Sequence, residues 1–112
     1  MSAHATRTAL AANPVPVTKK TRGFLRIVRH GAGPSAIYIV TYHKLDRQGA
    51  AAKPTLAEGA ESLIDLMEKI GVDFRVSEVR GALEDILRFG SANIPDLWLS
   101  DEEMVEKGLV EA

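Results

Sequence analysis

The spacing of apolar residues changes from a strand period to a helical period near the middle of this chain, and that change constrains its fold more than any other feature. Between Ser35 and Leu45, β-branched and aromatic residues dominate, with side chains expected to alternate between two faces as in a β-strand. From about Leu56 to Phe89, apolar residues recur at the spacing of one side of an α-helix. A strand region followed by a helical region predicts an α+β fold.

The strand region begins at Gly23 and is predicted to form a β-hairpin. Residues 24–28 form the first apolar run, residues 31–34 (Gly-Ala-Gly-Pro) break it, and the second run continues to Leu45. Both faces of the second run are largely apolar up to Val40. We therefore expect the middle of that strand to be covered on both sides.

Two amphipathic helices are predicted after the hairpin. Thr55–Glu58 has the pattern of a capping box, so the first helix is expected to begin there and to end at Gly71. The second is expected to run from near Ser77 to Phe89, with Leu87 turned inward, and Gly90 closes it.

The remaining apolar segments complete the predicted core. Residues 94–99 indicate a short extended segment, and Ser100–Glu103 is a second capping box that predicts a short helix. Trp98, the only tryptophan, is predicted to be a core residue. We expect one core that contains Leu63, Met67, Leu83, Ile86 and Trp98.

One small α+β domain is therefore expected over residues 22–112. It consists of a hairpin, with residues 94–99 as a candidate third strand, packed against two amphipathic helices and followed by a short C-terminal helix. The length of 112 residues suits a single core. Residues 1–21 have no apolar period and are expected to be a flexible arm; whether they are instead a targeting segment stays open.

No catalytic motif is complete in this sequence. The segment Arg29-His30-Gly31 resembles the signature of the histidine phosphatase superfamily, which needs a second histidine far downstream, but no histidine follows His43. His30 and His43 could also face each other across the hairpin as metal ligands, with Asp46 nearby. Two exposed histidines more often have no such role, so we expect no enzyme activity, cofactor or metal.

The compartment is constrained only weakly. The chain has no cysteine, which is compatible with the reducing cytoplasm. The longest apolar run is far shorter than the roughly 20 residues that a membrane helix needs. We expect a small soluble cytoplasmic protein with no membrane partner.

The charges of the two halves are opposite. Residues 1–53 contain nine basic residues and one acid, whereas residues 54–112 contain five basic residues and fourteen acids. Clustered lysine and arginine favour an anionic macromolecule, of which nucleic acid is the commonest. The expected function is a noncatalytic binding module that uses the basic arm and hairpin. The candidate binding residues are Lys19, Lys20, Arg22, Arg26, Arg29, Tyr38 and Tyr42.

Two alternatives remain open at this point. The acidic helical face could bind a basic surface of a partner protein, which would make the chain an interaction or inhibitor protein. The basic hairpin could also dock on the acidic helices of the same chain, or on those of a second copy in a homodimer.

Overall fold

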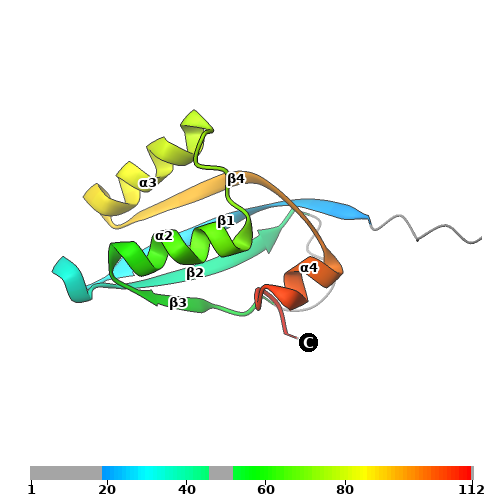
Figure 1. The fold of residues 1–112 in the computed structure, drawn as a ribbon, viewed down its shortest axis with the longest axis horizontal. Coiled ribbons are helices and arrows are strands. Elements are labelled where there is room, and N and C mark those ends of the chain that lie inside the picture. The colour runs from blue at the N-terminus through cyan, green and yellow to red at the C-terminus, as the bar shows by residue number, and fades with distance from the viewer. Residues whose placement is uncertain (1–18, 46–51, 112) are drawn as a thin grey trace, which may run out of the picture.

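The computed structural model describes residues 19–45 and 52–111 (Figure 1). Within them, the strands are β1 (Lys20–His30), β2 (Ile37–Lys44), β3 (Thr55–Glu58) and β4 (Ser91–Ser100). The helices are α2 (Gly59–Ile70), α3 (Ser77–Phe89) and α4 (Asp101–Glu106), with a 3-10 turn, η1 (Gly33–Ser35). The predicted α+β fold is confirmed. Most of the expected flexible arm, residues 1–18, lies outside the described residues, and β1 already begins at Lys20.

The strands form one antiparallel sheet in the order β3-β2-β1-β4. The predicted hairpin pairs β1 with β2, from Gly23 opposite Lys44 to His30 opposite Ile37. The segment predicted as a third strand is β4, and it lies on the other side of β1. The first strand is therefore an inner strand of the sheet.

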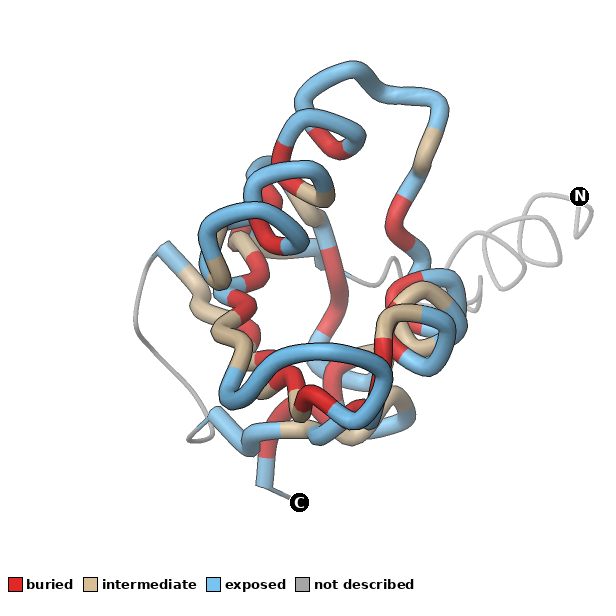
Figure 2. Tube along the Cα trace, turned by 90° about the vertical axis from the view of Figure 1, so that its left-hand side faces the viewer, coloured by how far each residue is buried: buried red, intermediate tan, exposed pale blue. Residues whose placement is uncertain are grey.

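The core lies between one face of this sheet and the helices. Leu25 and Ile27 of β1 and Val40 of β2 are fully buried against helical residues such as Leu63 and Ile86. Helices α2 and α3 lie on the same side of the sheet, and buried positions alternate along the strands (Figures 1 and 2). No described helix covers the other face. The expectation that both faces of β2 are covered is therefore not met by the described residues.

The segment Thr55–Glu58 is not the predicted helix cap. It is strand β3, which pairs with Ile37–Val40 of β2. Helix α2 begins after it at Gly59, whose φ of 81° lies in the left-handed region and whose missing side chain leaves room for the carbonyl oxygen of Pro34. Backbone pairing with β2 outweighs the local capping preference, which is worth about 1 kcal/mol.

Trp98 is not a core residue, because strand β4 contains a bulge. Strand β1 pairs Leu25 with Ile94 but Gly23 with Leu97, so β4 contributes an extra residue between these pairs. Asp96 lies in the bulge with a φ of 56°, a conformation that aspartate tolerates better than most residues. Simple alternation from Ile94 would turn Trp98 inward, but the extra residue turns it outward, and it is 53% exposed.

The C-terminal ends of the two long helices lie where the sequence predicts them. Gly71 and Gly90 end α2 and α3 as expected. The capping box of α4 is confirmed, since the Glu103 amide donates to Ser100 Oγ at 3.1 Å and the Ser100 amide donates to Glu103 Oε1 at 3.0 Å. The hydrogen bond from the Ser100 backbone amide holds the pKa of the Glu103 carboxyl below its ordinary value.

The described helices are short or amphipathic. None of them is long and apolar enough to cross a membrane.

Candidate binding face of the sheet

The face of the sheet turned away from the helices carries alternate residues of all four described strands, and we call it the open face. Strand register places cationic, aromatic and aliphatic side chains on it together. Its members are Arg22, Phe24, Arg26, Val28, His30, Ile37, Ile39, Thr41, His43, Leu56, Glu58, Ser91, Asn93 and Trp98.

Aromatic rings gather at one end of the open face. Phe24 and His43 are cross-strand partners, and their rings stack with centroids 5.1 Å apart and planes inclined by 19°. Trp98 lies opposite Arg22, two positions along β1 from Phe24. The His43 imidazole packs against the Phe24 ring, and its Nε2 is buried without a hydrogen-bond partner among the described residues.

Two arginines flank Phe24 along β1, because alternate residues of a strand share a face. Arg22 is paired with Asp96: its Nη2 lies 2.6 Å from Oδ1, and its Nε donates to the same oxygen at 2.7 Å. Arg26 lies opposite Thr41 and Asn93, is exposed, and has no ion pair among the described residues. Its guanidinium is therefore available to an anion.

A hollow of about 230 Å³ lies beside these groups. The residues that line it are Arg22, Gly23, Phe24, Leu45, Asn93, Pro95 and Asp96. An aromatic ring, a guanidinium and a carboxamide therefore border one depression. Such a surface can receive a planar polar group.

The other predicted binding residues do not lie together on this face. Lys19 is exposed at the start of β1, and Lys20 turns to α4, where its Nζ lies 3.4 Å from Glu103. Tyr38 and Tyr42 are only 3% and 1% exposed. Both tyrosines face the helices and belong to the core, so we omit them from the candidate site.

Arg29 also lies on the helical side, where it caps the C-terminal end of α3. Its Nη1 donates to the carbonyl oxygens of Leu87 at 2.7 Å and of Ile86 at 3.4 Å. A cation at this end of a helix satisfies free carbonyls and complements the helix dipole. Arg29 therefore has a structural role in the fold.

Arg29→Gln is expected to lower the free energy of unfolding by about 1 to 2 kcal/mol, because it removes charged hydrogen bonds to the end of α3. Arg26→Gln on the same strand should change it by less than about 0.5 kcal/mol, as is usual for exposed side chains. Urea unfolding of the two variants measures both values. Equal losses would contradict the capping role of Arg29.

The two histidines of the hairpin do not form a pair. His30 lies opposite Ile37 and His43 lies opposite Phe24, so they occupy opposite ends of the β1–β2 ladder. In residues 19–45 and 52–111, no group of three or more histidine, aspartate or glutamate side chains is arranged to hold a metal ion.

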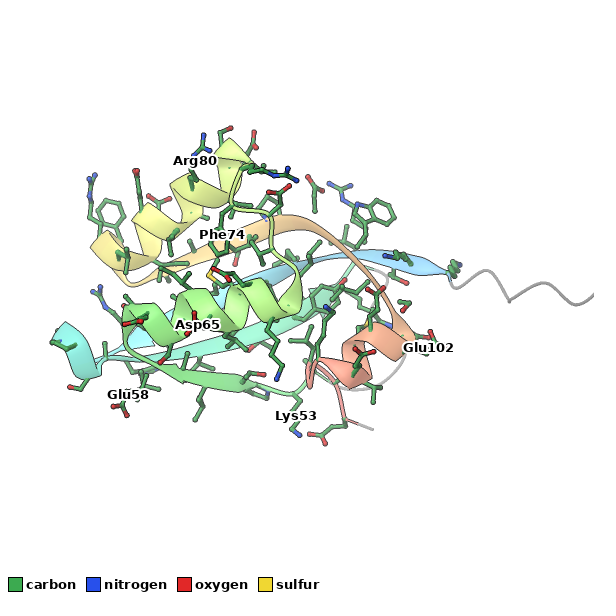
Figure 3. The ribbon with its side chains drawn as sticks, viewed as in Figure 1. Lys53, Glu58, Asp65, Phe74, Arg80 and Glu102 are labelled. Atoms are coloured by element: carbon green, nitrogen blue, oxygen red, sulfur yellow. The ribbon has the colours of Figure 1, made fainter. Side chains whose placement is uncertain are left out.

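The helical side of the molecule has the opposite electrostatic character. Asp65 on α2 and Glu102 on α4 are exposed there (Figure 3). A cavity of about 350 Å³ between the α2–α3 loop and β4 is bordered by the carboxylates of Asp73, Glu78 and Asp96. The hydrogen bond from the Arg75 side chain lowers the pKa of Asp73. This cavity is therefore unsuited to an anion, whereas the open face is suited to one.

Sequence reasoning missed three ring residues of this site, Phe24, His43 and Trp98. Strand alternation did contain a signal for Phe24, since it shares its parity with Arg22 and Arg26. The hairpin register adds His43. Trp98 depends on the bulge at Asp96, for which the sequence carries only the weak signal of Pro95.

Comparisons with protein-family models, with curated proteins and with solved structures found no match to this chain.

Proposed function

We propose that this protein is a noncatalytic binding module that engages an anionic macromolecule on the open face of its sheet. The observation that carries the proposal is Arg26, an exposed guanidinium near the middle of an inner strand with no ion pair among the described residues. When such a cation binds a phosphate or sulfate of a polymer, counterions of the polymer are released, and this release favours binding. The exposed carboxylates on the helices direct the polymer toward the sheet.

Salt-dependent binding to heparin tests this proposal, because heparin is a polyanion without bases. We expect binding that weakens as salt rises. Arg26→Gln should flatten the plot of log K against log salt concentration by roughly 0.7 to 0.9, the change for one lost anion contact. Arg80→Gln on α3 is the matched control, since it removes the same charge from the helical side. An equal effect of both variants, or no binding by the parent protein, would contradict the proposal.

A second candidate is a partner protein with a basic surface that meets the acidic helices. The support for it is the exposure of Glu61, Asp65 and Glu68 on α2. Electrostatic attraction of this kind needs no catalytic residue. Binding of polylysine that is abolished by Glu61→Gln and Glu68→Gln, together with no heparin binding, would favour this candidate.

A further inference from the structure

The chemistry of the open face also distinguishes among anionic polymers. Arg26 can bind a phosphate or sulfate of any polymer. Only a polymer that carries planar groups can also stack on the aromatic rings beside it. Phe24 stacks on His43, and Trp98 is 53% exposed across from Arg22. Rings on a strand surface offer flat apolar area to a base, and every base has a complementary π-face.

The hollow beside Phe24 adds hydrogen-bonding groups to this platform. The Asn93 carboxamide both donates and accepts, and the Asp96 carboxylate accepts. A nucleobase edge presents donors and acceptors of the same kinds. The hollow therefore offers a stacking surface and an edge partner together, which a simple polyanion cannot use.

Unpaired bases fit this surface better than a duplex does. A duplex hides its base faces, and its major groove is read by a helix or a two-stranded ribbon. The described helices expose many carboxylates, and the sheet face is four strands wide, so neither element suits a groove. Single strands present their bases to aromatic residues, with cations beside the backbone.

A second copy of the chain fits this face less well. Arg26 lies near the middle of β1, so two open faces packed around a twofold axis would bring two Arg26 guanidiniums close together. Asp96 in the β4 bulge already pairs with Arg22, and Glu58, the acidic member of the face, lies at its β3 edge opposite Ile37. Burying unpaired guanidiniums is costly, whereas a phosphate would neutralise them.

We propose that the open face binds single-stranded nucleic acid, with bases stacked on Phe24 and Trp98 and a backbone phosphate at Arg26. This inference rests on the proposed anionic partner at the same face. It names the partner class, the strandedness and the residues that recognise the bases.

Trp98 provides a direct readout, because it is the only tryptophan in the chain. Titration with a mixed-sequence single-stranded oligonucleotide should quench its fluorescence. Heparin at saturation should leave the emission nearly unchanged, since it has no base to stack. The duplex of the same sequence should bind at least about tenfold more weakly than the single strand.

Phe24→Leu and Trp98→Leu remove the rings and keep apolar side chains. Each variant should weaken binding of a labelled oligonucleotide about five- to 150-fold, the range for loss of one base stack, and should leave heparin affinity unchanged. Phe89→Leu is the matched control, because Phe89 is 70% exposed and also has an arginine beside it, but lies at the end of α3. Urea unfolding verifies that each variant is folded.

The outcomes separate the two proposals. Loss of oligonucleotide affinity in the Phe24 and Trp98 variants alone supports base stacking. Heparin binding that needs Arg26, with oligonucleotide affinity indifferent to both rings, overturns the stacking and leaves the anionic partner in place. No binding of any polyanion overturns both proposals. A concentration-dependent dimer that Trp98→Leu dissociates assigns the face to a second copy and overturns the inference.

Discussion

Gly23→Ala is expected to lower the free energy of unfolding by about 3 kcal/mol, the upper end of the usual cost of overpacking. A Cβ at this position would meet Cζ of Tyr42 at 2.5 Å and the carbonyl oxygen of His43 at 2.6 Å, and it would also meet the tyrosine hydroxyl. The backbone oxygen cannot move without breaking the β1–β2 ladder. Overpacking here must therefore displace a strand.

The position of Tyr42 explains why this site accepts no side chain. Its hydroxyl donates toward the carbonyl oxygens of Leu97 at 2.9 Å and of Thr21 at 3.2 Å. The ring starts on β2 and passes over Gly23 of β1 to reach β4, so it links three strands through one residue. A methyl group on Gly23 would break this link as well as the local packing.

Gly81→Ala is the matched control for this substitution. Gly81 lies inside α3, and a Cβ there would meet nothing within 4 Å. Alanine is favoured over glycine inside a helix, so this variant should gain about 0.5 to 1 kcal/mol. Urea unfolding of the two variants should show shifts of opposite sign. A Gly23→Ala protein as stable as the parent would contradict the described packing of Tyr42.

Ile86→Ala is expected to cost about 2 to 5 kcal/mol, because Ile86 is fully buried where α3 meets the sheet and its truncation leaves a cavity. Its neighbour Leu87, predicted from the sequence to face inward, is 44% exposed. Leu87→Ala should cost less than about 1 kcal/mol. Urea unfolding compares the two directly, and a larger loss for Leu87→Ala would mean that α3 is rotated about its axis.

The helices were predictable because their signals are local. Glycine at Gly71 and Gly90 ends a helix through its own backbone freedom, and Ser100 caps α4 through a residue three positions away. The Thr55 segment has an equally good local pattern. It fails there because hydrogen bonds to β2, a distant segment, compete with the cap, and a single sequence contains no sign of that competition.

The candidate site was predictable only in part for a related reason. Charge counts identified Arg22 and Arg26, but they could not separate these residues from Arg29, which the same strand turns toward α3. From the sequence alone, Tyr38 and Tyr42 were chosen as the aromatic binding residues, and Phe24 was not. The choice between core and surface depends on which sheet face the helices cover, and the position of Trp98 depends on one extra residue in β4.

The order of the strands has a consequence for how the chain folds. Strand β1 pairs on one side with its neighbour β2 and on the other with β4, and the paired side chains of Arg22 and Asp96 are 74 positions apart. The hairpin closes a short loop, whereas docking of β4 closes a long one and comes later. Until β4 docks, β1 has an unpaired edge beside apolar surface. A chain in which β4 is undocked would therefore be the form that we expect to be most prone to aggregation.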